Sequence, residues 1–283
     1  MNVYRAHIPA NQPDGKLSVY LRHAFSLLPE HALRDALKNR DVKMNGVRCG
    51  EGSMLMRDAE LLLYTRYEAA LPVVFEDENV LVIDKPANIS CDEDDRGGQT
   101  VLNVLTDRAK GQYTPRLCHR LDNQTSGLLI LAKNDLSEQC LLEAFSNREI
   151  DKRYVCLVRG IMRPEEAVRE AFLVKDPKLG RVRVVTHDTP EAKPIKTGYR
   201  LIGQEDCLSR VEVRLFTGRT HQIRAHMAFL GHPVLGDDVY GDRSLNKRMK
   251  TTALKLCSAS LTLHTTGILS YLNDRKFEAR VPF

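Results

Sequence analysis

The sequence predicts an α+β protein in which a small α/β domain at the N-terminus precedes a larger domain. Helical periodicity and strand-like runs alternate up to about residue 65, and short strand-like runs outnumber helical ones from residue 73 onward. A chain of 283 residues is long enough to bury two such cores. An apolar fraction of 42% and a charged fraction of 28% are ordinary for globular proteins and argue against disordered and fibrous classes.

The N-terminal part combines two helices with a small sheet. Apolar residues between Leu17 and Phe25 recur at helical spacing, and a second helical pattern follows Pro29. Asn45-Gly46 is a strong hairpin-turn signal between two short strand-like runs. The predicted elements are helices at 17–25 and 29–37, a hairpin at 42–49 and a strand at 59–64. We expect Glu68–Pro72 to link this unit to the rest of the chain.

The larger part is predicted to be rich in strands. Leu128–Ala132 is a short continuous apolar run, which is typical of a strand buried on both faces. A helix is expected after the Thr217-Gly218 turn, with Thr220 as its cap. The other predicted elements are a hairpin at 73–84, strands at 151–160, 181–186, 197–201 and 209–216, and helices at 100–110 and 136–148.

Composition limits the compartment and the partners. No apolar run approaches the roughly eighteen residues of a membrane-spanning helix, and residues 1–12 have neither a basic start nor an apolar signal core. We therefore expect a cytoplasmic protein with no membrane partner. The seven cysteines are scattered singly, which predicts reduced, mostly buried thiols. A net charge of +5 permits a polyanionic partner without demanding one.

The densest polar segment immediately precedes the buried strand at 128–132. Arg120 and Asp122 are two residues apart, so in an extended segment both side chains point to the same side. A surface salt bridge would explain an isolated Arg-x-Asp pair. Thr125, Ser126 and Gly127 add two hydroxyls and a permissive backbone point, which favours a functional loop.

A second polar segment opens the helix predicted after residue 220. Arg219, Gln222 and Arg224 gather at the N-terminal end of that helix, where free N–H groups and guanidinium groups favour an anion. The histidines of this segment do not predict a metal site. His221 and His226 are five residues apart, so a straight helix does not direct both rings to one ion.

The N-terminal unit carries basic residues that resemble the RNA-binding face of an S4 domain. The resemblance lies in residues 17–25 and in the segment Ala36–Gly46, whose pattern is a helix, a basic residue and Val-x-x-Asn-Gly. It implies phosphate contacts through charge and counterion release from Arg34, Lys38, Arg40 and Lys43. The alternative is a solvated helix face, because Asp35 and Asp41 are interleaved.

Residues from Val73 to the C-terminus resemble the RluA-type pseudouridine synthases. The family's motifs occur in its order, at Asp84-Lys85-Pro86, His119–Gly127, Lys152-x-Tyr154, Gly218–His226 and Gly231–Asp237. The resemblance implies a mixed, largely antiparallel sheet with a central cleft. It also implies an S4-like domain at 1–68, a catalytic domain at 69–283, an RNA substrate of ribosomal or transfer type, and no cofactor or metal. We expect a monomer.

The resemblance assigns roles to residues of these motifs. Asp122 matches the catalytic aspartate, Tyr154 the tyrosine beneath the target base, and Arg224 the basic partner of the aspartate. Arg120 matches the arginine that probes the stack as the target nucleotide leaves it. Asp122 would act either as nucleophile at C1′ or as base at C2′, and the residues do not separate these routes. The further substrate or RNA-binding candidates are Lys85, Thr125, Arg219, His221 and Gln222.

Two positions depart from the family pattern. Asn88 stands where the family usually has glycine after Lys-Pro, and Cys257 stands where it often has histidine. Neither belongs to the predicted catalytic trio, so they bear on the choice of RNA target.

Two other functions compete with uridine isomerisation. An N-glycoside hydrolase would also act at C1′, but it usually needs two carboxylates facing one sugar, and the Asp122 motif contains one. A non-catalytic RNA-binding or ribosome-associated protein would use the S4-like unit and a basic C-terminal segment. That segment contains Arg243, Lys247, Arg248, Lys250 and Lys255.

Overall fold

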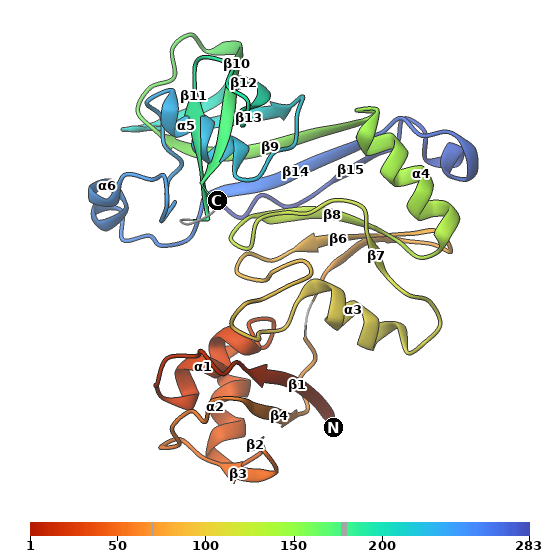
Figure 1. The fold of residues 1–283 in the computed structure, drawn as a ribbon, viewed down its shortest axis with the longest axis vertical. Coiled ribbons are helices and arrows are strands. Elements are labelled where there is room, and N and C mark those ends of the chain that lie inside the picture. The colour runs from red at the N-terminus through yellow and green to blue at the C-terminus, as the bar shows by residue number, and fades with distance from the viewer. Residues whose placement is uncertain (70, 177–179) are drawn as a thin grey trace. The chain divides into compact units, whose positions relative to one another are not determined.

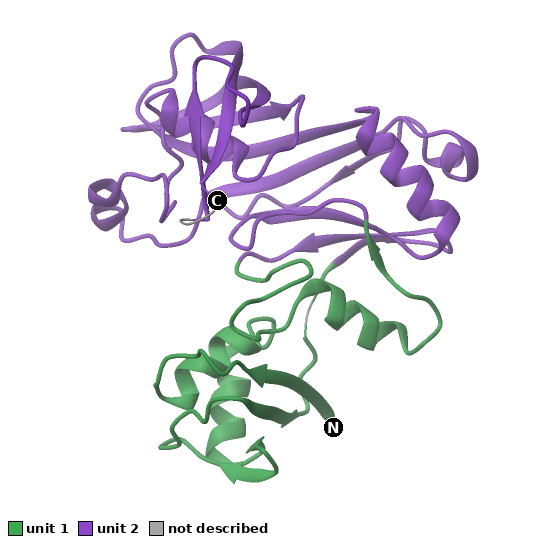
Figure 2. Ribbon diagram, viewed as in Figure 1, with its two compact units in different colours: residues 1–72, 88–117 green, residues 73–87, 118–283 purple. Residues whose placement is uncertain are grey.

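The computed structural model describes residues 1–69, 71–176 and 180–283, and these form two compact units (Figure 2). Unit 1 comprises Met1–Pro72 and Asn88–Leu117, and unit 2 comprises Val73–Ala87 and Cys118–Phe283. The first hairpin of unit 2 therefore interrupts unit 1 in the sequence. The functional boundary expected between residues 68 and 69 stays a prediction. Ala70, within the expected linker, lies outside the described residues.

The first part of unit 1 is a four-stranded antiparallel sheet with two helices (Figure 1). Its strand order is β1-β4-β2-β3, and the helices contribute Leu17, Leu21 and Leu33 to the buried core. The predicted helices and hairpin are confirmed. The bounds are β1 Asn2–Ile8, α1 Leu17–Ala24, α2 Glu30–Lys38, β2 Val42–Met44, β3 Val47–Cys49 and β4 Ala59–Thr65.

The β2–β3 hairpin has the turn that its sequence predicts. Asn45 has φ of 46° and Gly46 has φ of 81°, so both central residues are left-handed. Two left-handed residues produce the primed turn whose twist matches that of the flanking strands. Local sequence alone was therefore enough to predict this element.

The second part of unit 1 packs against its first helix. Helix α3, Val101–Ala109, begins with a capping box between Thr100 and Asn103. The preceding loop is tied to α1, because the Tyr20 hydroxyl donates to the Arg96 carbonyl at 2.6 Å and His23 Nε2 lies 3.1 Å from Asp94 Oδ1. The unit ends with β7, Arg116–Leu117.

Unit 2 is built on one large mixed sheet with the order β11-β10-β12-β13-β9-β14-β8-β6-β5, and β15 pairs with β14. Within this sheet β14 and β8 run parallel, and the other pairs in that order are antiparallel. The predicted α+β class and largely antiparallel sheet are confirmed. The strands are β5 Val73–Glu76, β6 Val80–Lys85, β8 Ser126–Ala132, β9 Ile150–Arg159, β10 Glu166–Asp176, β11 Arg181–Val185, β12 Lys193–Glu205, β13 Leu208–Leu215, β14 Leu256–Leu263 and β15 Lys276–Glu278.

Strand β8 lies within the core, as its apolar run predicts. Residues Leu128–Ala132 are fully buried, and β8 has β6 on one side and β14 on the other. Helix α4 follows it with a capping box of Asn134 and Ser137. The helices of unit 2 are α4 Asp135–Ser146, α5 Gln222–Phe229, α6 Arg243–Arg248 and the 3-10 helix η1 Gly267–Leu272.

The structure corrects the start of α5 and adds elements that the sequence did not predict. The cap expected at Thr220 is wrong, because His221 occupies the cap position without a side-chain cap bond. Its φ of 53° is left-handed, a conformation seldom adopted by a residue with a side chain. Strands β1, β10, β14 and β15 were not predicted, although residues 2–7 of β1 alternate between half-buried and exposed.

The described residues bear on the expected absence of a membrane-spanning helix and on the expected state of the cysteines. Within them, no helix is long and apolar enough to cross a membrane. All seven cysteines are free thiols, and Cys207 is the exposed one. The thiols at 49, 91, 118, 156 and 257 are buried, as predicted.

Gly127, at the start of β8, allows β14 to pack close to the loop that carries Asp122. Its φ is +104°, and a Cβ added there would lie 2.3 Å from the carbonyl oxygen of Ser258. The two strands pair in parallel at this point, through Gly127 and Ser258. A side chain at position 127 would therefore have to displace backbone.

We predict that Gly127→Ala lowers the free energy of unfolding by about 3 kcal/mol or more, because overpacking and backbone strain add. Urea denaturation measures it. The matched control is Gly231→Ala, since Gly231 also has positive φ, +87°, but open space around its Cβ position. We expect the control to lose about 1 kcal/mol. Equal losses in the two variants would contradict the steric explanation.

Candidate active site

The loop before β8 is held from inside the protein. The Thr125 N–H donates to the Asp122 carbonyl at 3.0 Å, which closes a turn over the two intervening residues. The fully buried Lys85 at the end of β6 donates from Nζ to the carbonyl of Asn123 at 3.1 Å and to that of Pro86 at 3.0 Å. The backbone that carries Asp122 is therefore fixed by buried hydrogen bonds.

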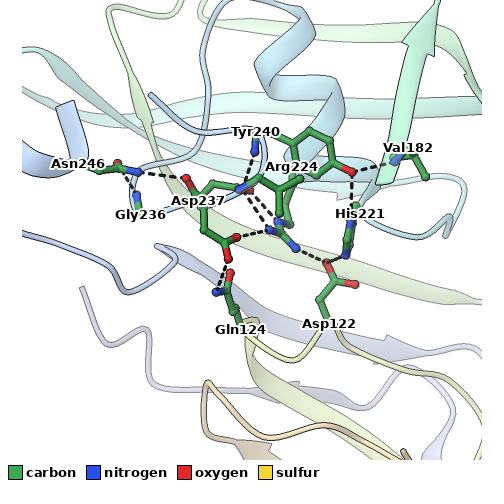
Figure 3. Close-up of polar contacts among 11 residues, drawn as sticks. Asp122, Gln124, Val182, His221, Arg224, Gly236, Asp237, Tyr240 and Asn246 are labelled. Carbon is green, nitrogen blue, oxygen red and sulfur yellow. Dashed lines mark hydrogen bonds and ion pairs between the residues drawn. The ribbon is translucent and has the colours of Figure 1, made fainter. Parts of the chain in front are cut away.

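The Asp122 carboxylate faces two nitrogen groups from the helix α5 segment (Figure 3). Its Oδ2 lies 3.5 Å from Arg224 Nη1 and 3.9 Å from His221 Nε2. The carboxylate side chain is 25% exposed, whereas that of Arg224 is 4% exposed. Asp122 is thus the more accessible member of this pair, and Arg224 approaches it from within.

Asp237 is the main partner of Arg224. Arg224 Nε donates to Asp237 Oδ2 at 2.7 Å, and Arg224 Nη2 donates to Oδ1 at 3.0 Å. This bidentate geometry is the strong form of an arginine–carboxylate pair, and both side chains are buried. Burial opposes the charge of both groups, but the pairing prevails, so the pKa of Arg224 is raised and that of Asp237 is lowered.

The loop that carries Asp237 is itself fixed. Asp237 Oδ1 also accepts the N–H groups of Val239 and Tyr240, each at 2.8 Å. Asn246 clamps the loop, because its Nδ2 donates to the Asp237 carbonyl at 3.0 Å and its Oδ1 accepts the Gly236 N–H at 2.9 Å. The direction of Arg224 is therefore set by backbone contacts as well as by charge.

A third carboxylate completes the polar cluster. Asp238 Oδ1 lies 3.2 Å from Arg224 Nη2, and Gln124 Nε2 donates to Asp238 Oδ2 at 3.2 Å. The Asp238 side chain is 61% exposed. One guanidinium thus contacts the carboxylates of Asp122, Asp237 and Asp238, so this group of four charged side chains is negative overall.

Tyr240 contacts the ring nitrogen of His221 that faces away from Asp122. The Tyr240 oxygen accepts the Val182 N–H at 2.9 Å and lies 3.1 Å from His221 Nδ1 (Figure 3). Burial is the main cause of the raised pKa of Tyr240 and the lowered pKa of His221, which favours a neutral hydroxyl and a neutral ring. A carboxylate that faces Nε2 favours the tautomer with the ring proton on Nε2, and in that tautomer Nδ1 accepts the Tyr240 hydroxyl proton.

The match to a family model covers the segment in which this geometry lies. The model for RNA pseudouridylate synthase matches residues 79–229, which is more than half of the chain and includes Asp122, His221 and Arg224. The chain belongs to the RNA pseudouridylate synthase family. The resemblance to pseudouridine synthases is thereby confirmed, and the protein is an isomerase of uridine in RNA.

Curated relatives of this pseudouridine synthase agree over most of its length. It is 33% identical over 257 residues to ribosomal large subunit pseudouridine synthase D of Salmonella typhimurium, covering 84% of this chain and 76% of the relative. The enzyme of the same name from Escherichia coli strain K12 is 31% identical over the same coverage. Among solved structures, human RNA pseudouridylate synthase domain containing 1 superposes with a TM-score of 0.60 at 25% identity, over 76% of this chain and 91% of that one.

Three residues expected to bind the pseudouridine synthase's substrate lie inside the protein instead. Lys85 and Thr125 are buried beneath the Asp122 loop. The buried Gln222 amide uses all four hydrogen-bonding positions within the protein. Its Oε1 accepts from Thr217 Oγ1 and the Arg219 N–H, and its Nε2 donates to the Lys196 carbonyl and Thr197 Oγ1. All three residues support loops in this structure, and their expected contact with substrate stays a prediction.

The other predicted residues occupy positions that substrate can reach, or lie in the sheet beside the loop. Arg120 and Arg219 are exposed, and the part-buried His221 faces Asp122. Tyr154 is buried in the middle of β9, opposite Val213 of β13 and Ser258 of β14. The roles assigned to these side chains remain proposals.

The basic residues of the S4-like face are largely exposed. Arg34 and Lys38 lie one turn apart on α2 and are exposed, as is Arg40. Lys43 is half-buried, with Nζ 5.4 Å from the centroid of the Tyr64 ring. This arrangement suits phosphate contacts, but the S4 assignment stays a prediction.

Sequence reasoning missed Asp237, Asp238 and Tyr240. The signal was present, because Gly236-Asp237 ends the last of the quoted motifs, but no role followed from it.

The departure at Asn88 is accommodated by its backbone. Its φ of 67° is left-handed, and asparagine adopts that conformation more readily than most residues with a side chain. Cys257 is buried beside Ser126, and burial raises its pKa to about 11.

His119, at the start of the catalytic motif, is a neutral acceptor. Its Nε2 accepts the Ile130 N–H at 3.1 Å, and its ring stacks on Phe145 at a centroid distance of 4.5 Å. Desolvation, followed by the nearby charge of Lys152, lowers the pKa of His119 from 6.5 to about 3. This ring therefore supports the fold in its uncharged form.

Removing the charge of Asp237 should impair both the site and the fold. We expect Asp237→Asn to lower the free energy of unfolding by about 3 kcal/mol, since Arg224 is left as a buried cation without its main partner. The rate of pseudouridine formation should fall as well. Urea denaturation and single-turnover assays measure the two effects. Asp238→Asn is the matched control, with an expected loss under about 1 kcal/mol because its carboxylate is exposed.

Stability should depend on His119 at acid pH. The unfolded chain binds a proton at His119 below pH 6.5, whereas the folded chain binds it only near a pKa of about 3, so stability falls as the pH is lowered between these values. We predict that His119→Gln removes this component, so that its stability approaches that of the wild type as the pH falls. Urea denaturation across this pH range tests it. The exposed His187→Gln is the control, and a constant gap between His119→Gln and wild type would contradict the prediction.

Proposed function

We propose that this protein converts specific uridines of large-subunit ribosomal RNA to pseudouridine, with Asp122 as the catalytic residue. The observation that carries the proposal is a reachable carboxylate at 3.5 Å from a buried guanidinium, within the segment matched by the family model. The curated relatives are named for the ribosomal large subunit, which favours that RNA over transfer RNA.

The chemistry requires one C–N bond to break and one C–C bond to form at C1′. Positive charge develops on the ribose as uracil departs, as it does in other reactions at this carbon. The negative cluster of Asp122, Asp237 and Asp238 around Arg224 is suited to stabilise that charge, since its groups are already oriented. Asp122 acts either as nucleophile at C1′ or as base at C2′.

Further roles follow from the positions of the neighbouring side chains. Arg224 directs Asp122, while the Nε2–H of His221 faces the same carboxylate oxygen. The exposed Arg120 has the length and planarity to occupy the space left by an extruded nucleotide. Tyr154 supplies the surface beneath the base. We also expect the enzyme to act as a monomer in the cytoplasm, without metal or cofactor.

The central test is the variant Asp122→Asn, which keeps the size of the side chain and removes its charge. We expect the fold to be retained and pseudouridine formation to fall by about 100- to 10,000-fold, the usual range for a positioned acid or base. Pseudouridine mapping of ribosomal RNA with wild type and variant measures it. Asp206→Asn is the matched control, because Asp206 is exposed in a left-handed turn that asparagine adopts equally well.

The outcomes separate the competing functions. Full activity in Asp122→Asn would reject the catalytic assignment. Release of free uracil would favour the N-glycoside hydrolase, and modification confined to transfer RNA would reject the ribosomal substrate. Rescue of a deletion phenotype by Asp122→Asn would make RNA binding the biological role. Activity that survives chelating agents would agree with a metal-free reaction.

A further inference from the structure

A basic groove in unit 2 has no part in the roles assigned so far, apart from Arg219. It has a volume of about 570 Å³ and lies where the end of α4, the start of β9 and the end of β13 meet. The basic residues of its lining are Arg148, Lys152, Lys196, Arg214, Arg219 and His264. Among the described residues that line it, Asp151 is the one acidic side chain.

The single acid does not neutralise the groove. Asp151 Oδ2 lies 3.0 Å from Arg153 Nε, and its Oδ1 lies 2.8 Å from Arg214 Nε. One carboxylate is therefore shared by two guanidinium groups. Lys196 Nζ pairs with Glu170 Oε1 at 2.8 Å, from outside the lining. Arg148, Lys152 and Arg219 still make the groove positive, and such a groove attracts an anionic ligand.

Lys152 is the most informative side chain of the groove. It is part-buried, its Nζ lies 5.6 Å from the centroid of the Phe145 ring, and a Cβ at Gly218 would come within 3.2 Å of Nζ. Within the described part of the chain, its ammonium group has neither a hydrogen bond nor a carboxylate partner. Burial lowers the pKa of Lys152, since a desolvated charge is unfavourable without a partner. An anionic ligand would supply that partner.

Aromatic rings position two other cations. Lys196 Nζ lies 5.6 Å from the centroid of the Phe216 ring, and the Arg214 guanidinium carbon lies 4.9 Å from it. These cation–π contacts orient the charges and occupy the ring. The groove therefore offers charge more than a free stacking surface, which suits phosphate groups better than bases.

Two segments of the chain connect the groove to the candidate active site. Lys152 and Tyr154 are two residues apart on β9, so their side chains point to the same face of the sheet. Arg219 lies two residues before His221, which faces Asp122. A ligand in the groove would therefore lie next to the nucleotide that reacts.

We infer that this groove binds the sugar–phosphate backbone of a single-stranded RNA segment beside the target uridine. This inference rests on the proposed function. Its volume lies within the range of about 300–1,000 Å³ typical of small-ligand pockets, which suits one or a few nucleotides and not a double helix. Extrusion of a base requires that the adjoining strand be held, and a row of cations holds it without reading its sequence.

The test removes two cations of the groove and measures RNA binding. The variant Arg148→Gln/Lys152→Gln is compared with the parent protein, both carrying Asp122→Asn so that no RNA is converted. The probe is a ribosomal RNA fragment that contains a mapped target uridine. We expect Kd to rise about tenfold or more at low salt, and the slope of log affinity against log salt to weaken by about 1.4, or about 0.7 per lost phosphate contact.

The matched control is Arg169→Gln/Lys175→Gln, which removes two exposed cations on β10 that do not line the groove. It should change Kd and salt slope much less than the groove variant. Equal losses in both variants, or an unchanged Kd in the groove variant, would overturn the inference. Displacement of the RNA by poly-L-glutamate at equal charge concentration would also overturn it, because the groove would then accept acidic polypeptide equally well.

Two further measurements separate a loss of RNA binding from a loss of stability and from a failure of the proposed function. Lys152→Gln removes a part-buried ammonium group that lacks a partner, so the variant should keep or raise the urea midpoint of unfolding. A clear fall in that midpoint would show that Lys152 stabilises the fold and would count against a role in binding. The wild type is assayed for pseudouridine in parallel. Normal isomerisation with unchanged binding by the groove variant rejects only the groove. Weakened binding by the groove variant, with no pseudouridine formed by the wild type, rejects only the proposed function.

Discussion

The buried ion pair between Arg224 and Asp237 is the interaction on which the candidate active site depends. A guanidinium that is 4% exposed would be strongly unfavourable without a partner, and Asp237 supplies two hydrogen bonds to it. Asp237 is fixed in turn by two backbone N–H groups and by the Asn246 clamp. Only Nη1 of Arg224 is left to face Asp122, so the position of the guanidinium beside that carboxylate follows from buried contacts.

The same principle extends to the loops around the site. Lys85 and Gln222 carry polar groups that look suitable for RNA, yet both are buried and hold loop backbone. The left-handed His221 and the close approach at Gly127 add backbone constraints. Together these features hold a few partly exposed groups in place, and such rigidity favours a reaction that needs exact alignment at C1′.

Charge is divided between the proposed active site and the proposed binding groove within unit 2. The cluster around Arg224 holds three carboxylates, whereas five of the residues that line the groove are lysines or arginines. A net charge of +5 for the whole chain conceals this separation. An enzyme that attracts a polyanion and then stabilises positive charge on a sugar needs both, and keeping them on different loops lets each act locally.

The sequence by itself determined the elements whose signals are local. The Asn45-Gly46 turn, the buried run at 128–132 and the amphipathic helices α1, α2 and α4 follow from side-chain periodicity and turn chemistry. The motifs also predicted that Arg224 is the partner of Asp122, because their order resembles that of a known family. Only the tertiary structure decided which polar residues are buried supports and which are reachable. Asp237 and Tyr240 enter the site through loop packing. The motif that ends in Gly236-Asp237 marked Asp237 in the sequence, but its pairing with Arg224 depends on contacts between segments that spacing does not reveal.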